Sequence, residues 1–112
     1  MTIQVGVTDI TNAARRIKGT VRRTPLIDVS DHVNHPLALK CENLQVAGSF
    51  KIRGAYNLIA QLAGESPGRG VITYSSGNHA QAVAYAARAL GLQAVVVMPE
   101  TAPAIKVDGV RT

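Results

Sequence analysis

The architecture of this chain follows from residues 71–98, which read VITYSSGNHAQAVAYAARALGLQAVVVM. The β-branched run 71–74 predicts a strand, and the continuous apolar run 94–98 predicts a second strand that is covered on both faces. Between them, the alanine-rich segment 78–90 is apolar on nearly every side and predicts a buried helix. Strand, helix and strand joined by short links predict a right-handed βαβ unit with parallel strands.

Further elements are expected on the N-terminal side of this unit. Ser49 is expected to cap a helix whose apolar stripe runs through residues 52–63. Residues 37–42 predict a strand, and residues 26–27 predict a short extended piece. Thr8 is expected to cap a first helix, because apolar residues recur at helical spacing after it.

A last helix is expected to begin near Thr101 or Ala102, with Pro103 in its first turn and Gly109 weakening it. Only two buried parallel strands are predicted, and a doubly wound sheet needs more. We therefore expect this chain to be the N-terminal piece of a larger protein.

Composition limits the class of protein. The chain has 112 residues, of which 46% are hydrophobic and 17% charged, a balance typical of one globular domain. We find neither an apolar run of the roughly 18 residues that span a membrane nor a secretory signal. A single cysteine, Cys41, excludes an internal disulfide and favours a reducing cytosol. Five of the twelve cations lie within residues 15–23, which we interpret as a solvated helix face because no aromatic residues interleave with them for nucleic-acid stacking.

Lys51 stands at the start of the second predicted helix, within the motif GSFKIRGA of residues 48–55. A helix N-terminus disfavours a cation, Arg53 adds another positive charge, and Phe50 and Ile52 place apolar surface on either side. All of these favour a neutral amine, the form that attacks an aldehyde to make a Schiff base. Taken alone, Lys51 also fits an ordinary surface lysine.

A polar turn, Ser75-Ser76-Gly77-Asn78-His79, joins the first predicted strand of the βαβ unit to its helix. Ligands of open α/β sheets bind at the carboxyl ends of strands, and the N–H groups of a helix start suit an anion. Gly77 permits close backbone approach, while the serines and Asn78 add polar partners. The turn fits an anion site and a capped tight turn about equally well, and His79 fits either a cap or a catalytic base.

Competing motifs are missing from the sequence. Neither a dinucleotide-binding glycine motif nor a P-loop is present, and no cluster of histidine and cysteine has the spacing of metal ligands, so no metal site is predicted. His32 and His35 are expected in a solvated loop. Cys41 is expected to be a small buried side chain in a strand.

Five motifs together identify a family. They are TPL at 24–26, KCENLQ at 40–45, GSFKIRGA at 48–55, SSGNHAQ at 75–81 and MPETAP at 98–103. In this order they resemble the N-terminal part of the threonine/serine dehydratase and serine racemase family, which are pyridoxal-phosphate enzymes of the tryptophan-synthase-β fold type. The resemblance covers the whole chain and implies an α/β fold built of parallel βαβ units, a truncated fold-type-II enzyme.

The resemblance also implies roles for individual residues. Lys51 would hold pyridoxal phosphate as a Schiff base and remove the substrate α-proton, Phe50 would pack near the cofactor, and Asn78 would bind its phenolic oxygen. Ser76 matches the serine that acts on the opposite face in racemases, which makes it a second catalytic candidate. The loop expected to take the substrate carboxylate consists of Ser75, Ser76, Asn78 and His79.

By the same resemblance, residues 1–41 would belong to a large subdomain and residues 42–112 to a small one. The glycine-rich phosphate loop of the family and the residue facing the pyridine nitrogen would lie beyond Thr112. Val46 and Ala47 stand where nucleotide-regulated racemases carry polar residues, which favours a dehydratase.

The implied activity is an ammonia-lyase reaction that converts L-threonine or L-serine to a 2-oxo acid and ammonia. The resemblance implies a cytoplasmic enzyme that is a homo-oligomer when full length, acts on a small amino acid and has no nucleic-acid or membrane partner. A serine racemase and a 3-hydroxyaspartate dehydratase on the same scaffold remain alternatives. So does an inactive fragment, because the 112-residue chain alone is expected to lack activity.

Overall fold

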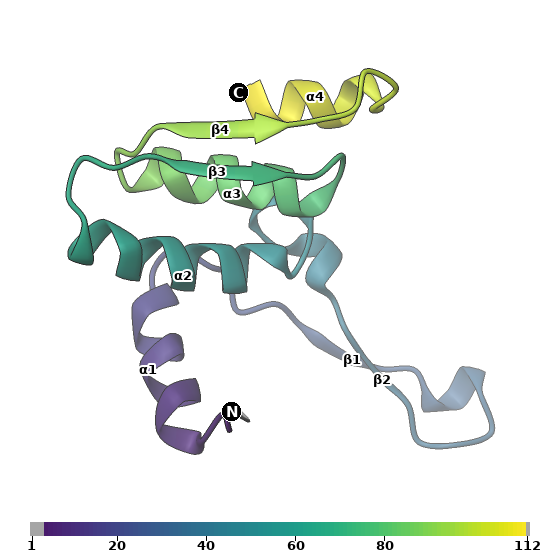
Figure 1. The fold of residues 1–112 in the computed structure, drawn as a ribbon. Helices are drawn as coiled ribbons and strands as arrows, with labels where there is room; N and C mark the ends of the chain where they lie inside the picture. The colour runs from purple at the N-terminus through teal and green to yellow at the C-terminus, as the bar shows by residue number, and fades with distance from the viewer. Residues whose placement is uncertain (1–3, 112) are drawn as a thin grey trace.

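The computed structural model describes residues 4–111. These residues form the helices α1 Val7–Ile17, α2 Lys51–Glu65, α3 Asn78–Ala89 and α4 Ala104–Arg111, and the strands β1 Leu26–Asp28, β2 Ala38–Lys40, β3 Val71–Tyr74 and β4 Ala94–Val97. Short 3₁₀ helices lie at η1 Ser30–His32, η2 Glu42–Leu44 and η3 Val46–Gly48. Figure 1 shows α2 and α3 side by side next to the β3–β4 pair, while α1 and the β1–β2 hairpin extend away from it.

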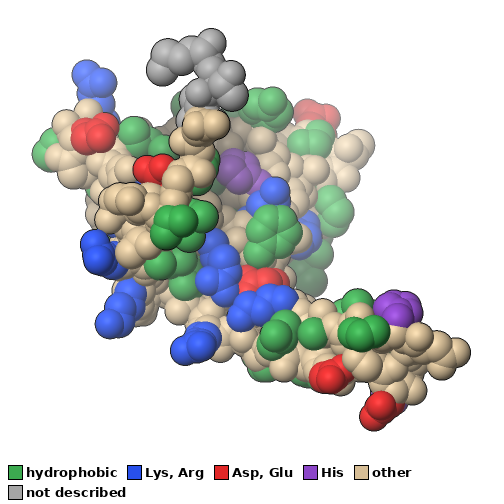
Figure 2. Space-filling view, turned by 90° about the horizontal axis from the view of Figure 1, so that it is seen from below, with side chains coloured by type: hydrophobic (Ala, Val, Ile, Leu, Met, Phe, Trp, Pro, Cys, Tyr) green, Lys and Arg blue, Asp and Glu red, His purple; other side chains and the backbone are tan. Residues whose placement is uncertain are grey.

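The β1–β2 hairpin is exposed to solvent. β1 and β2 pair antiparallel, with Leu26 opposite Lys40, and every residue of both strands is exposed. The second strand is shorter than expected, since Cys41 lies past its end and is only half-buried where η2 begins. Figure 2 shows the hairpin projecting from the body, with lysine and arginine side chains gathered where it joins.

The starts of α1 and α4 differ from the sequence prediction. α1 begins at Val7, so Thr8 lies inside it, and the Gly6 N–H is held by Asp9 Oδ2 at 2.8 Å. α4 begins at Ala104, so Pro103 precedes the helix, and the Pro103 carbonyl accepts from the Lys106 and Val107 N–H groups at 2.9 and 3.2 Å. Within residues 4–111, no helix combines the length and apolar character needed to cross a membrane.

The predicted βαβ unit is present. β3 and β4 pair in parallel, with Val71 opposite Ala94 and Tyr74 opposite Val97, and α3 connects them. β3 has the predicted bounds, whereas β4 and α3 each end one residue earlier than predicted. α3 ends just before Leu90, and Gly91 turns the chain with a positive φ of 68° that favours glycine.

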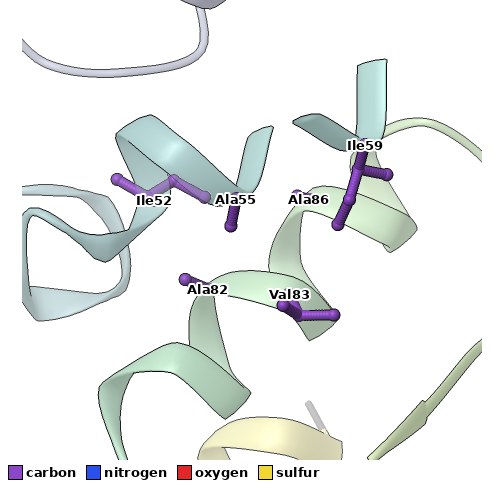
Figure 3. Close-up of a cluster of buried hydrophobic side chains, with 6 residues drawn as sticks. All are labelled: Ile52, Ala55, Ile59, Ala82, Val83 and Ala86. Atoms are coloured by element: carbon purple, nitrogen blue, oxygen red, sulfur yellow. The ribbon is translucent and has the colours of Figure 1, made fainter. Parts of the chain in front are cut away.

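The core lies between α2 and α3 (Figure 3). Small alanines on α3 let the two helices approach closely, and Ile52 of α2 is fully buried against them. The core cluster consists of Ile52, Ala55, Ile59, Ala82, Val83 and Ala86. This interface fixes the direction of α2 and therefore the place where its first residue stands.

The β3–β4 pair is covered on one face only. Ile72 is 75% exposed and Tyr74 85%, and Val95 and Val97 are each more than half exposed. Side chains alternate across a strand, so the residues between them face the helices while these four point the other way. The expectation of strands buried on both faces is therefore wrong for residues 4–111, because α3 packs on a single side.

Candidate active site

Lys51 is the first residue of α2 and its side chain is exposed. Its Nζ lies 5.0 Å from the centroid of the Phe50 ring, close enough for a cation–π contact. The N-cap residue is Phe50 and not Ser49 as predicted, although Ser49 Oγ still accepts from the Lys51 N–H at 3.4 Å. The amine therefore stands at the helix start with an aromatic face beneath it.

Two features expected around this amine are different in the structure. Ile52 is buried in the α2–α3 core and provides no apolar surface beside Lys51. Arg53 does not stand as a free positive charge, because its Nη2 lies 2.7 Å from Glu42 Oε1. Residues 52 and 53 therefore anchor the helix start, and only residue 50 lies against the amine.

A partly buried polar cluster holds the other side of this helix start. We call Thr24, Glu42, Gln45 and Arg53 the Glu42 cluster. Thr24 Oγ1 donates to Glu42 Oε1 at 2.6 Å, and Arg53 Nε donates to Glu42 Oε2 at 3.0 Å. Gln45 Nε2 donates to Arg22 O at 2.8 Å and reaches Glu42 Oε2 at 3.4 Å. The cluster thus ties the chain before β1 to the first turn of α2.

The hydrogen bonds from Arg53 lower the pKa of Glu42 to about 2, against the opposing effect of burial. Thr24 and Gln45 are both buried, and their donors also reach this carboxylate. No sequence pattern reveals this cluster as a unit, because its members lie far apart in the chain and follow no period.

The predicted polar turn lies at the carboxyl end of β3. The Ser75 N–H donates to Val97 O at 3.0 Å, and Ser75 Oγ accepts from the Gly77 N–H at 3.2 Å. Gly77 is the N-cap residue of α3, and a Cβ built there would meet no atom within 4 Å. The space beside this turn is open, as an approaching ligand would require.

His79 lines two surface depressions that also include other predicted site residues. A depression of about 800 Å³ is lined by residues that include Ser75, Ser76 and His79. Another of about 390 Å³ includes Phe50, Lys51 and His79 among its lining residues. The imidazole Nε2 lies 3.1 Å from Thr73 Oγ1, a contact that restrains the ring. His79 therefore lines both the depression that includes Lys51 and the depression that includes Ser75 and Ser76.

Asn78 occupies a different place from the other candidates. It is the first residue of α3, and its Oδ1 accepts from Lys106 Nζ at 2.6 Å. Asn78 is not among the described residues that line either depression. Sequence analysis did not single out Lys106, and the only signal for it is its position just after the MPETAP motif.

The groups at this site suit an aldehyde cofactor. A primary amine can form a Schiff base, and the start of α3 offers N–H groups to an anion beside exposed hydroxyls. Pyridoxal phosphate fits the residues present, since it brings an aldehyde for Lys51 and a phenolic oxygen for the N-terminal turn of α3.

Comparison with known proteins agrees with this reading. The family model described as "Pyridoxal-phosphate dependent enzyme" matches residues 17–112. An L-threonine ammonia-lyase of Thermotoga maritima is 49% identical over 92% of this chain and 26% of that protein. An L-threo-3-hydroxyaspartate ammonia-lyase of Saccharomyces cerevisiae is 45% identical over 88% of this chain and 31% of that protein.

The fold is shared with solved structures. The crystal structure of a pyridoxal 5'-phosphate-dependent aspartate racemase matches with a TM-score of 0.89 and 39% identity, over 99% of this chain and 36% of that one. The chain thus spans about a third of the length of the proteins it matches. The comparisons confirm the predicted fold class, the resemblance and the cofactor of the family, while the residue roles stay predictions. With most of its residues matched by the family model, the chain belongs to the pyridoxal-phosphate dependent enzymes.

Proposed function

We propose that the intact protein carrying this chain is a pyridoxal-phosphate-dependent ammonia-lyase that converts L-threonine or L-serine to a 2-oxo acid and ammonia. The observation that supports it most is the shared position of His79, which lines both the depression beside Lys51 and the one beside Ser75 and Ser76. An amine for the cofactor and an anion-binding turn for the substrate are therefore neighbours.

Lys51 Nζ would hold the cofactor aldehyde. Once the substrate amine had displaced it, the free Lys51 amine would take the proton from the substrate Cα. Pyridoxal phosphate, when bound, supplies the electron sink that stabilises the resulting carbanion. The Phe50 ring, which already lies under the Lys51 side chain, would pack beside the cofactor.

The start of α3 would bind the substrate carboxylate. Its first N–H groups have no partners within the helix and form the positive end of the helix dipole. Ser75, Ser76, Asn78 and His79 would form this loop, and the exposed Ser76 hydroxyl would stand on the substrate face opposite Lys51. Asn78 would meet the cofactor's phenolic oxygen.

The turn before Lys51 favours a dehydratase over a racemase regulated by nucleotides. Val46 packs against the α2–α3 core, and Ala47 has a φ of 58°, so this turn is shaped by apolar packing and backbone geometry. Serine racemase and 3-hydroxyaspartate dehydratase activity are the alternatives. We further propose a cytoplasmic homo-oligomer in which residues 1–41 and 42–112 contribute to a large and a small subdomain.

The experiment is reductive trapping in the intact protein. Borohydride reduction followed by peptide mapping should place the cofactor on Lys51, and Lys51→Ala should abolish the label and lower 2-oxo acid formation by about 10³-fold or more. Lys18→Ala, at the exposed C-cap position of α1, is the matched control and should keep both the label and the 2-oxo acid formation. A label on another lysine, or none, contradicts the proposal.

Product analysis separates the alternatives. L-threonine, L-serine and 3-hydroxyaspartate are supplied in turn, and 2-oxo acids and D-serine are quantified. D-serine as the main product from L-serine would replace the lyase with the racemase. If the trapped cofactor is found but the 112-residue chain alone binds none, the chain alone is an inactive fragment and the proposal for the intact protein stands.

A further inference from the structure

Lys106 of α4 reaches across to the first turn of α3. Its Nζ donates to Asn78 Oδ1 at 2.6 Å and to Gln81 Oε1 at 3.1 Å. Gly109, one turn further along α4, packs so closely on Gln81 that a Cβ there would overlap this side chain. The two helices are therefore held together at the place where α3 begins.

The chemistry of an ammonium group decides how the two amides are oriented. A lysine ammonium has three donors and no acceptor, so only the carboxamide oxygens of Asn78 and Gln81 can face it. With its oxygen turned toward Lys106, Asn78 holds its NH₂ group on the side away from the ammonium, where it can face a ligand. An NH₂ group is a donor, so the ligand atom that meets it must be an acceptor.

We propose that Lys106 is a positioning residue that fixes the Asn78 carboxamide as a hydrogen-bond donor toward an oxyanion of the bound cofactor. The inference rests on the proposed function, in which the phenolic oxygen of pyridoxal phosphate is that acceptor. It assigns to α4 a role in cofactor binding that the contacts of Lys51 alone do not provide.

Electrostatics argues against a purely structural role for this contact. The N-terminus of α3 carries the positive end of its helix dipole, where a cation is disfavoured. Lys106 nevertheless places its ammonium on the first residue of α3. An anion bound at this turn would be attracted by both positive charges, so the arrangement is favourable once such a ligand is present.

The test compares two variants of α4 in the intact protein. Lys106→Met keeps the aliphatic stem and removes the donors, whereas Val107→Ala removes packing from a half-buried neighbour and keeps both hydrogen bonds. We expect Lys106→Met to bind pyridoxal phosphate about tenfold more weakly, with an altered absorption spectrum of the bound cofactor. Val107→Ala should lower the melting temperature and leave the spectrum unchanged. Equal affinity and equal spectra for the two variants would overturn the proposal.

A second variant keeps the proposal testable should Lys106→Met fail to fold. Asn78→Asp retains acceptors for Lys106, so α4 should stay docked and the melting temperature should not fall, but the side chain loses its donor. We expect its affinity for pyridoxal phosphate to fall at least about tenfold. Wild-type affinity in Asn78→Asp would also overturn the proposal.

A ligand-free measurement separates this inference from the proposed function. In the protein without cofactor, the side-chain amide NMR signals of Asn78 should shift in Lys106→Met and stay in place in Val107→Ala. Unmoved signals in Lys106→Met refute the Lys106 contact. Failure of the wild-type protein to bind pyridoxal phosphate, with the signals shifting as expected, refutes the proposed function instead.

Discussion

The α2–α3 interface and the Glu42 cluster hold the same helix start by opposite means. Ile52 enters an apolar interface, while the next residue, Arg53, enters a network of charged and polar groups. Lys51 immediately precedes both. The position of the amine is therefore fixed from two sides. Non-directional apolar packing holds one side, and directional hydrogen bonds hold the other.

The two regions also respond differently to solution conditions. Apolar burial is independent of pH, because no group in the α2–α3 core titrates. The Glu42 cluster depends on one carboxylate staying ionised. Substitutions on the two sides should therefore differ in the size of their effect on stability and in the pH dependence of that effect.

Ile52→Ala should give the largest loss. It removes a fully buried side chain and leaves a cavity between two helices, so the free energy of unfolding should fall by about 3 kcal/mol. Denaturant unfolding of the intact protein measures it. The control is Ile105→Ala, on α4 at a position that is 75% exposed, and equal losses in the two variants would contradict the prediction.

Glu42→Gln should come next. It leaves Arg53 without its ionic partner while keeping the size of the side chain, so unfolding should require about 2 kcal/mol less at neutral pH. Glu65→Gln, at the exposed end of α2, is the matched control and should change stability by less than about 0.5 kcal/mol.

The pH dependence of this difference has a defined sign. The pKa of Glu42 is lowered in the folded state from 4.5 to about 2, so its contribution is fully present above pH 4.5 and is lost as the pH falls toward 2. Wild type should therefore lose its advantage over Glu42→Gln in that window, as measured by unfolding at several pH values. A difference that persists unchanged at pH 2 would mean that packing, and not charge, makes the cluster stabilising.

Ala47→Gly should have the smallest effect and the opposite sign. Ala47 lies in the turn that links the two regions and adopts a φ of 58°, which strains any residue with a Cβ. Glycine should stabilise the protein by about 0.5–1 kcal/mol, whereas Ala60→Gly inside α2 should destabilise it by about 1 kcal/mol. Thermal unfolding of both variants measures the two changes in stability. Destabilisation by Ala47→Gly would show that alanine is not strained in this turn.

Sequence periodicity was sufficient for one side of this comparison only. The apolar spacing of residues 52–63 and the alanines of α3 predicted the interface, because burial follows the helical repeat. The Glu42–Arg53 and Thr24–Glu42 contacts span 11 and 18 residues with no repeat to reveal them. The Lys106–Asn78 contact spans 28 residues and depends on how α4 docks.

The motifs that contain the candidate site residues could be predicted from the sequence, but the contacts around them could not. Lys51 and the Ser75–His79 turn were predicted as site residues from their positions at helix starts, and His79 lines the depressions beside both Lys51 and the two serines. That Ile52 turns away from the amine, and that Asn78 faces α4, follows from tertiary packing that no local pattern encodes.

The uncovered face of the β3–β4 pair determines how this region can be handled in isolation. Ile72, Tyr74, Val95 and Val97 form an apolar surface next to strand edges that have no partner within residues 4–111. Such a surface attracts hydrophobic dyes and other copies of itself. Residues 1–112 prepared alone would therefore be prone to aggregation. Polar substitutions at these four positions would be required before the binding properties of this isolated region could be measured.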